Sequence, residues 1–200
     1  MTEDGPAERK RCLRQRLLSR RRNLSADEVR RRSDAVCNRL FELGEVHRPP
    51  GLVLYAAIGG EVRVERIFHE RRAAGGVCFL PVFDPSNHAY RIAEVADYQL
   101  DTVEGKFGIR EPHPSRPCLT AAEMKTADIT WLVPGVAFDG RGGRLGRGAG
   151  YYDRLMAGTA GVRVGVAYDW QLVPEVPRTP SDIDMNVIVT EQSINHCPTQ

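Results

Sequence analysis

The hydrophobic pattern of the first quarter of the chain predicts two helices. Leucines recur at helical spacing within residues 6–22 and give this segment one apolar side. Ser25–Glu28 has the S-x-x-E form of a capping box, which marks the start of a second helix near Ser25. Valine and leucine continue at spacings of one and two turns after it, until Pro49-Pro50-Gly51 breaks the helix.

Beyond that break, short apolar runs alternate with helical segments. The strands that we expect are residues 52–55, 77–80, 88–95, 129–133, 162–167 and 187–189, the last of these being the final strand. The helices are residues 64–72 and 151–157, and the stretch of about thirty residues after 95 is rich in loops. A strand, a helix and a strand in succession over residues 52–80 indicate a βαβ unit.

This order of elements predicts the fold class. With no internal repeat or heptad, the sequence predicts a single three-layer α/β domain over residues 1–200, with a mostly parallel central sheet. The N-terminal helical segment is expected at about residues 6–48.

Residues that carry chemistry fall near the ends of three strands. Glu61 follows the first strand, a glycine-rich loop follows 129–133, and Asp182 lies in the segment before 187–189. Because ligands bind at the carboxyl ends of strands in open α/β sheets, these places point to one shared site. A glutamate that simply faces solvent at a strand end is the alternative for Glu61.

Composition narrows the function classes. The hydrophobic share of 42% and the charged share of 27% suit a globular protein, and no apolar run approaches the roughly 20 residues of a membrane span. The N-terminal segment has no apolar core behind its charges, so we expect no secretory signal and a cytoplasmic protein. The five scattered cysteines are interpreted as free thiols in a reducing compartment.

Positive charge is concentrated near the N-terminus. The arginine runs 20–22 and 30–32 are interpreted as solvated helix faces. A nucleic-acid-binding surface, built from these runs and the basic glycine loop, is the competing hypothesis. The net charge of +2 and the lack of an aromatic stacking platform argue against it, so we expect no nucleic-acid partner.

The segment GGRLGRGAGYYDR, residues 142–154, carries the most specific chemistry. Its five glycines permit positive φ and close approach, so successive backbone amides can point at one anion. A helix that starts near Gly150 would add free N–H groups, and Arg144 and Arg147 would add guanidinium forks for phosphate. The segment lacks the Lys-Ser or Lys-Thr of a Walker loop, and Tyr151 replaces the third glycine of a dinucleotide fingerprint. A phosphate cradle and a mobile surface loop both remain open.

Three further charged residues have two interpretations each. Asp153, in the first turn of the predicted helix, either complements the helix dipole or holds Mg²⁺ beside a phosphate. Lys10 and Arg14 are one helical turn apart and border the leucine side, so they either contact an anion or are simply solvated.

These motifs resemble a known family. The segment PGVAFDGRGGRLGRGAGYYDR, residues 134–154, is similar to the signature of the 5-formyltetrahydrofolate cyclo-ligases, also called methenyltetrahydrofolate synthetases. Further similarities follow the same order along the chain, namely Lys10–Arg14, Glu61-Val62 after a tyrosine-containing strand, Phe107–Pro112 and Val187–Glu191. The resemblance therefore spans nearly the whole chain.

The resemblance implies a fold and a reaction. The fold would be Rossmann-like, of the kind shared with sugar-phosphate isomerases and CoA transferases. The reaction would be the ATP- and Mg²⁺-dependent cyclisation of 5-formyltetrahydrofolate to 5,10-methenyltetrahydrofolate, with release of ADP and phosphate. The formyl oxygen would attack the γ-phosphate, and N10 would close the ring before phosphate leaves. Such chemistry needs positioning and charge neutralisation, and no serine or cysteine nucleophile.

The resemblance also implies site residues, position by position. ATP would be held by Lys10, Arg11, Arg14, Arg144, Leu145, Gly146, Arg147, Gly148, Ala149, Gly150, Tyr151 and Tyr152. The reduced folate would lie against Ala56, Glu61, Arg147, Gly148, Ala149, Gly150 and Tyr151. Mg²⁺ would be held by Asp153 and Asp182, and catalysis would rest on Arg144, Arg147 and Tyr152.

The chain departs from the family pattern at a few positions. Arg63 and Val64 stand where the family often has Asp and Thr, and Ser181 stands where it often has His. Because these positions lie on the substrate and metal sides, a relative that binds ATP but acts on a different substrate is the alternative. Either way, we expect a monomer that acts on a small molecule, here a reduced folate with or without a polyglutamate tail, and that contacts no membrane.

Overall fold

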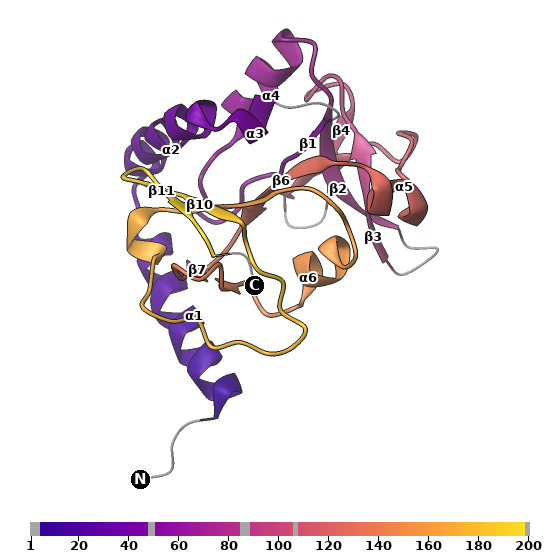
Figure 1. Ribbon diagram of the computed structural model, residues 1–200. Coiled ribbons are helices and arrows are strands. Elements are labelled where there is room, and N and C mark those ends of the chain that lie inside the picture. The colour runs from indigo at the N-terminus through magenta and orange to yellow at the C-terminus, as the bar shows by residue number, and fades with distance from the viewer. Residues whose placement is uncertain (1–4, 48–50, 85–88, 106–107, 199–200) are drawn as a thin grey trace.

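A seven-stranded sheet forms the centre of the fold (Figure 1). The computed structural model describes residues 5–47, 51–84, 89–105 and 108–198. In spatial order the strands are β11 (Ile194–His196), β10 (Val187–Val189), β9 (Arg163–Val166), β6 (Ile129–Pro134), β1 (Gly51–Val53), β2 (Cys78–Asp84) and β3 (Ala89–Glu94). The inner strands pair in parallel, whereas the edge strands β3 and β11 pair antiparallel. The predicted α/β class with a mostly parallel sheet is therefore confirmed.

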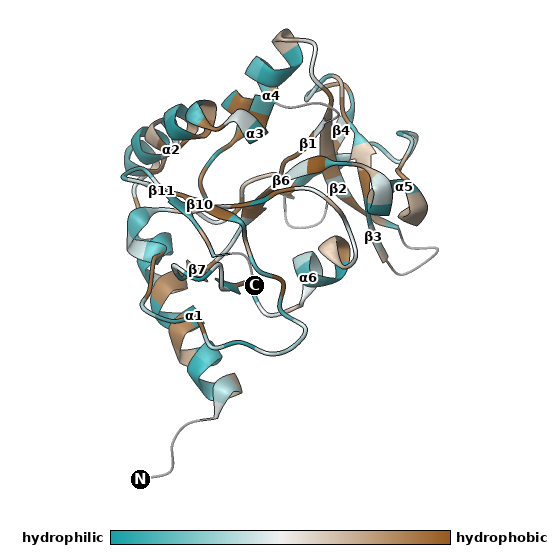
Figure 2. Cartoon of the chain, viewed as in Figure 1, coloured by the Kyte–Doolittle hydropathy of each residue, from teal (hydrophilic) through white to brown (hydrophobic). Residues whose placement is uncertain are grey.

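Helices cover both faces of this sheet and give three layers. One face is covered by α2 (Ala26–Glu42), α3 (Gly44–His47) and α4 (Glu65–Ala73), and the other by α5 (Ala121–Thr126) and α6 (Tyr151–Met156). In β6, Trp131 and Val133 face the side of α5 and α6, whereas Leu132 between them faces the side of α2. Burial on both faces is expected of a parallel sheet between two helical layers. Hydrophobic residues accordingly run through the central strands in Figure 2, and outer turns of α2 are hydrophilic.

The chain changes its direction across the sheet between β1 and β6. From β1 it passes through α4 to β2 on one side, whereas β6, β9 and β10 follow on the other side. Such a switch point is where open α/β sheets bind ligands, because the loops after the two strands separate there. Glu61 lies in the loop after β1, and the glycine-rich segment lies in the loop after β6.

The first helix, α1 (Pro6–Arg22), lies against the loop that follows β6 (Figure 1). That loop begins with a small antiparallel hairpin of β7 (Ala137–Phe138) and β8 (Arg144–Leu145). Leu17 of α1 shares a buried cluster with Ala137 and Leu145 of the hairpin. This packing brings the basic side chains of α1 to the glycine-rich segment.

One predicted boundary in the N-terminal half is different in the structure, and others lie at residues that the structure does not describe. Helix α2 ends at Glu42, because Leu43 takes an extended conformation (φ −83°, ψ 119°), and the separate turn α3 follows. The predicted break at Pro49 and Pro50 lies outside the described residues, and so does His88 of the predicted strand 88–95.

The segments after β3 and β10 also differ from the prediction. The stretch after residue 95 is not only loop, since it contains β4 (Thr102–Glu104), β5 (Arg110–Pro112) and α5. A capping box at Thr120 and Glu123 starts α5, and its T-x-x-E form can be recognised in the sequence. The prediction that Val187–Val189 is the final strand is wrong, because the more polar β11 adds an antiparallel edge after it.

The described chain has free thiols and lacks membrane-spanning helices. All five cysteines are thiols that form no disulfide, as predicted. Burial raises the pKa of the Cys37 and Cys78 thiols to about 12, so both stay protonated at neutral pH. No helix within the described residues is long and apolar enough to cross a bilayer.

Candidate functional site

Glu61 is held by a tight turn after β1. The turn from Ile58 to Glu61 closes with a hydrogen bond of 3.1 Å from the Glu61 amide to the Ile58 carbonyl. Gly59 and Gly60, at its central positions, have φ values of 54° and 77°, which glycine adopts without strain. The Glu61 carboxylate turns back and accepts a hydrogen bond of 3.1 Å from the Ile58 amide. Only 8% of Glu61 is exposed, so the alternative of a solvent-facing glutamate is wrong.

Two arginines from distant parts of the chain meet on this carboxylate. Nε and Nη2 of Arg147 both lie 3.3 Å from Oε1 of Glu61, and Nη2 also donates to the Ile58 carbonyl at 3.2 Å. Nη2 of Arg21 lies 3.3 Å from the same Oε1. We call Arg21, Glu61 and Arg147 the switch-point triad, because it joins α1 with the loops after β1 and β6.

The close packing of this turn predicts the effect of Gly60→Ala. An added Cβ would lie 3.0 Å from the Arg21 carbonyl oxygen, on a backbone with φ of 77°. We expect urea denaturation to show a loss of about 1–3 kcal/mol in the free energy of unfolding. Gly75→Ala is a matched control, since Gly75 also has φ of 77° but no atom within 4 Å of its added Cβ. Equal losses in both variants would show that the contact with Arg21 constrains nothing.

A buried aspartate anchors the base of the loop after β6. Asp139 is 0% exposed and accepts hydrogen bonds from the amides of Arg141 (2.9 Å), Gly143 (3.0 Å) and Val176 (2.8 Å). Nη2 of Arg178 donates to it at 3.1 Å. Burial would raise the pKa of Asp139, but these amide bonds and the Arg178 charge lower it below its ordinary value. The charged carboxylate thus ties the hairpin turn to the segment that contains Val176 and Arg178.

The glycine-rich part of the loop lies beside α1. Nε of Arg14 donates to the Gly146 carbonyl at 2.8 Å. Gly148 has φ of 112°, and a Cβ there would lie 3.6 Å from the guanidinium carbon of Arg14. Gly150 takes the left-handed conformation (φ 61°) as the N-cap of α6. The structure therefore brings Arg14 and the loop together, and the helix begins where the sequence predicts it.

Arg144 is enclosed beneath this loop. Its side chain is 3% exposed, and Nη2 donates to Oδ1 of Asp153 at 2.9 Å. The guanidinium carbon lies 5.6 Å from the centre of the Tyr152 ring, within the range of a cation–π contact. Burial raises the pKa of Tyr152, and the Glu61 charge adds to this effect, so its hydroxyl stays protonated at neutral pH. Asp153 is therefore the counter-ion of Arg144 as well as an acidic residue in the first turn of α6.

Tyr151 belongs to a row of aromatic side chains that reaches the edge of the sheet. Its ring centre lies 3.5 Å from that of Tyr90 on β3 and 5.1 Å from that of Tyr152. Tyr90 in turn packs on Phe83 of β2, with ring centres 4.9 Å apart. These rings come from separate segments and meet only in the fold, where they pack on one another.

Lys10 and Asp182 form an ion pair of 2.5 Å between α1 and the segment before β10. The Thr179 amide also donates to Asp182 at 2.7 Å. Burial would raise the pKa of Asp182, but the hydrogen bonds from Lys10 and Thr179 lower it. The next amide, of Ile183, donates to Asp153 at 3.3 Å. The two carboxylates predicted to serve Mg²⁺ thus belong to adjoining segments.

Asp153 and Asp182 suit a cation that is shared with a nucleotide. Oδ1 of Asp153 accepts both contacts given above for that side chain, and Oδ2 of Asp182 accepts the contacts from Lys10 and the Thr179 amide. Within residues 5–47, 51–84, 89–105 and 108–198, no three His, Cys, Asp or Glu side chains converge as a metal cage. Mg²⁺ commonly takes one or two carboxylates with substrate phosphates and waters, which fits this donor set.

The remaining predicted residues lie outside this cluster or at its margin. Arg11 points away on the exposed side of α1, where it pairs with Glu8. Ala56 is half-buried in the loop after β1, and Leu145 is buried in β8. The carbonyl of Ala149 accepts a hydrogen bond of 2.8 Å from Nη1 of Arg154.

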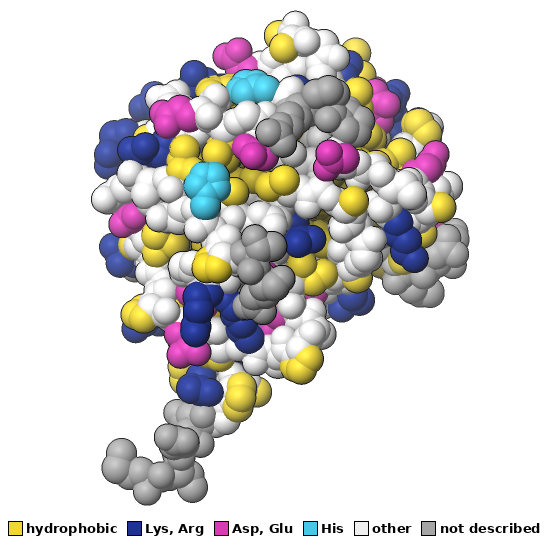
Figure 3. Space-filling view, viewed as in Figure 1, with side chains coloured by type: hydrophobic (Ala, Val, Ile, Leu, Met, Phe, Trp, Pro, Cys, Tyr) yellow, Lys and Arg dark blue, Asp and Glu magenta, His cyan; other side chains and the backbone are white. Residues whose placement is uncertain are grey.

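The interpretation of the arginine runs as solvated faces is wrong for two members. Arg21 is buried in the triad, and Arg32 pairs with Glu191 and Glu28. Arg21 lies four residues after Leu17, so helical periodicity already places it on the inward face of α1. On the face that Figure 3 shows, acidic side chains are interspersed among the basic ones, which does not favour a nucleic-acid surface.

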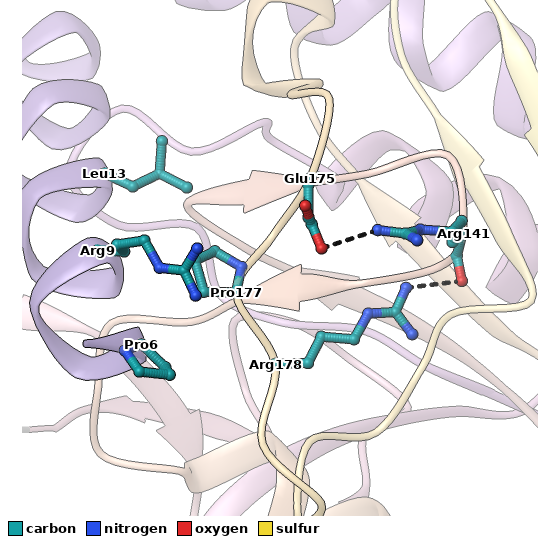
Figure 4. Close-up of a pocket in the computed structure, with 7 residues that line it drawn as sticks. All are labelled: Pro6, Arg9, Leu13, Arg141, Glu175, Pro177 and Arg178. Carbon is teal, nitrogen blue, oxygen red and sulfur yellow. Dashed lines mark hydrogen bonds and ion pairs between the residues drawn. The ribbon is translucent and has the colours of Figure 1, made fainter. Parts of the chain in front are cut away.

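A cavity of about 600 Å³ lies between α1 and residues 175–178 (Figure 4). Arg9, Arg141 and Arg178 line it together with Glu175, and Arg141 pairs with Glu175 at 3.1 Å. Asp139 and Asp184 neutralise Arg178. Because the lining contains no predicted site residue and most of its charges are paired, the switch-point triad is the stronger candidate site.

The chain is similar to known proteins over α1 and over the two loops that form this site. Residues 6–191 match the model of the 5-formyltetrahydrofolate cyclo-ligase family. The chain is 26% identical over 182 residues to the 5-formyltetrahydrofolate cyclo-ligase of Escherichia coli K12, covering 89% of this chain and 98% of the relative. It is 45% identical over 91 residues to the 5-formyltetrahydrofolate cyclo-ligase of Mycolicibacterium smegmatis, covering 44% of this chain and 45% of the relative.

A solved structure agrees over nearly the whole length. The NMR structure of 5,10-methenyltetrahydrofolate synthetase from Aquifex aeolicus superposes with a TM-score of 0.82 at 35% sequence identity. The superposition covers 96% of this chain and 94% of that chain. The order of strands and the loops that carry the triad therefore belong to a fold that this relative shares.

Proposed function

Because the chain belongs to the 5-formyltetrahydrofolate cyclo-ligase family, we propose that it closes 5-formyltetrahydrofolate to 5,10-methenyltetrahydrofolate. The reaction uses ATP and Mg²⁺ and releases ADP and phosphate. The switch-point triad carries the proposal, because it sets the Glu61 carboxylate 3.3 Å from the Arg147 guanidinium. A hydrogen-bond acceptor for the N–H groups of the pterin ring thus lies beside a hydrogen-bond donor for phosphate. Phosphoryl transfer from the nucleotide to the folate requires both groups to be close together.

The nucleotide side consists of the glycine-rich loop, α1 and Arg144. The loop amides around Gly148 and the start of α6 at Gly150 offer free N–H groups to phosphate. Lys10 and Arg14 add charge from α1. Arg144 is fixed by Asp153, so its charge is in place before the reaction, which is the arrangement that lowers electrostatic barriers.

The folate side consists of the turn after β1 and the aromatic row. The Glu61 carboxylate can accept hydrogen bonds from the amino and ring N–H groups of the pterin. The backbone at Ala56 lies in the same loop. Tyr151 gives a flat apolar face beside the glycine-rich segment, where an aromatic ring of the substrate can pack.

The proposed chemistry balances without a protein nucleophile. The formyl oxygen attacks the γ-phosphorus while the bond to ADP breaks, which turns that oxygen into part of a leaving group. N10 then attacks the formyl carbon, phosphate departs with the oxygen, and N10 loses its proton. Arg147 can neutralise the transferring phosphate, and Tyr152, which keeps its proton at neutral pH, can donate a hydrogen bond. Asp153 and Asp182 would hold Mg²⁺, which supplies further charge neutralisation.

An absorbance assay tests this proposal. Purified protein mixed with 5-formyltetrahydrofolate, ATP and Mg²⁺ should develop the near-ultraviolet absorbance of methenyltetrahydrofolate, and omission of ATP should abolish it. A folded protein that forms no product would contradict the proposal. If calorimetry then showed ATP binding without folate binding, a relative acting on a different substrate would be favoured.

Three further properties stay predictions. We expect a monomer, a cytoplasmic location and use of folates with or without a polyglutamate tail. Light scattering on the purified protein checks the first, and the absorbance assay with mono- and polyglutamyl substrates checks the last.

A further inference from the structure

We propose that Arg21 is a positioning residue for folate binding, which holds the Glu61 carboxylate in place while Arg147 turns to the phosphates of ATP. The inference rests on the proposed function. It assigns a role to a residue of α1 that lies apart from the Lys10 and Arg14 pair on the same helix.

The two arginines of the triad differ sharply in exposure. The side chain of Arg21 is 2% exposed, whereas that of Arg147 is 46% exposed, although both lie 3.3 Å from Oε1 of Glu61. A long side chain that is half in water can change partners at little cost, but a buried guanidinium can not leave its counter-ion without a large penalty. The geometry therefore divides the triad into a fixed member and a movable member.

Arg21 has a second anchor that fixes its guanidinium. Nη1 donates to the Gly135 carbonyl at 3.2 Å, directly after β6, while Nη2 faces Glu61 in the turn after β1. The fork thus bridges both sides of the switch point. Gly60, whose missing Cβ would lie 3.0 Å from the Arg21 carbonyl oxygen, lets the turn approach the helix closely.

The two contacts of Arg21 determine where the Glu61 carboxylate lies after Arg147 has turned to ATP. With Arg21 in place, the buried carboxylate keeps a charged partner and stays aimed at the folate. Without Arg21, Arg147 would be the remaining guanidinium on Glu61, and the phosphates of ATP would compete with Glu61 for it. Loss of Arg21 should therefore weaken folate binding more than ATP binding.

Kinetics of three variants test this role. Arg21→Met should raise the KM for 5-formyltetrahydrofolate by about tenfold or more, and leave the KM for ATP within about threefold of the wild-type value. The folate KM of Arg21→Lys should lie between the values of the wild type and Arg21→Met. One ammonium group cannot bind both the Gly135 carbonyl and the Glu61 carboxylate as the planar guanidinium does. Arg22→Met is the matched control, since Arg22 is the next residue and is exposed, and it should behave like the wild type.

A double-mutant cycle tests whether Arg21 acts through Glu61. Glu61→Gln should itself weaken folate binding, and adding Arg21→Met should then raise the folate KM by less than about twofold more. If Arg21→Met does not fold, Arg21→Lys alone and combined with Glu61→Gln replaces it in the cycle. A full additive loss in the double variant would overturn the proposed role.

The remaining outcomes separate this inference from the proposed function. An active wild type with an unchanged folate KM in Arg21→Met overturns the inference alone. Equal increases in both KM values also overturn it, because they indicate a general disturbance of the fold. A wild type that binds no folate in calorimetry overturns the proposed function and this inference together.

Discussion

Replacing Arg147 with alanine is expected to lower ATP-dependent turnover by about 10²–10³-fold. Its guanidinium reaches both Glu61 and the Ile58 carbonyl, so it lies where the nucleotide loop meets the folate turn. A group that neutralises a transferring phosphate acts mainly in the transition state, so kcat should fall more than the KM for ATP rises. Steady-state kinetics with the methenyltetrahydrofolate absorbance measure both constants.

The same variant should remain folded. The Arg147 side chain is 46% exposed, and half-exposed ion pairs contribute little to stability, while Glu61 keeps Arg21 as a partner. We expect the free energy of unfolding in urea to change by less than about 1 kcal/mol. Joint collapse of stability and turnover would point instead to a structural role for Arg147.

Two further substitutions calibrate this result. Arg141→Ala removes a side chain that is 60% exposed and paired with the exposed Glu175, so turnover should stay at the wild-type level. Arg147→Lys should recover part of the lost turnover, because it restores the charge without the planar fork. Wild-type turnover in Arg147→Ala would remove this residue from the site.

The parallel core of the fold is predictable because its strands are short apolar runs. In β6, five consecutive positions from Ile129 to Val133 are buried, whichever face they point to. The break between α2 and α3 is not predictable in this way, since Leu43 is buried and continues the apolar pattern although its backbone is extended. The edge strand β11 is not predictable from its own residues, because its middle position is the polar Asn195. Its extended conformation depends on pairing with β10.

The site is predictable only as far as its local motifs reach. The glycine-rich loop can be recognised in one stretch, but Arg147 and Glu61 are 86 positions apart and meet because β1 pairs with β6. Arg21 shows a different limit, because a run of arginines suggests solvent exposure while the position of Leu17 suggests an inward face. Asp139 carries no such signal in the sequence, because three of its partners are backbone amides and the fourth, Arg178, lies 39 positions away.

Asp139→Asn is expected to lower the free energy of unfolding by about 3–5 kcal/mol at pH 7. The buried carboxylate accepts from three amides and from Arg178, and an asparagine places an NH₂ group where one of these donors now points. Because the hairpin turn at Asp139 precedes Arg144 and Arg147 in the same loop, turnover should fall as well. Asp128→Asn, at an exposed carboxylate, should change the free energy by less than about 0.5 kcal/mol.

The pH dependence of this loss identifies its cause. The pKa of Asp139 is lowered in the folded protein, where amide bonds and Arg178 outweigh the effect of burial. The charge therefore stabilises the fold above the ordinary aspartate pKa of about 3.9, and this stabilisation is lost as the pH falls through the folded value. Urea denaturation between pH 7 and pH 3 should show the gap between wild type and Asp139→Asn narrowing below about pH 4. A gap of constant size would assign the loss to packing of the side chain, since a difference in charge must disappear once the carboxylate is protonated.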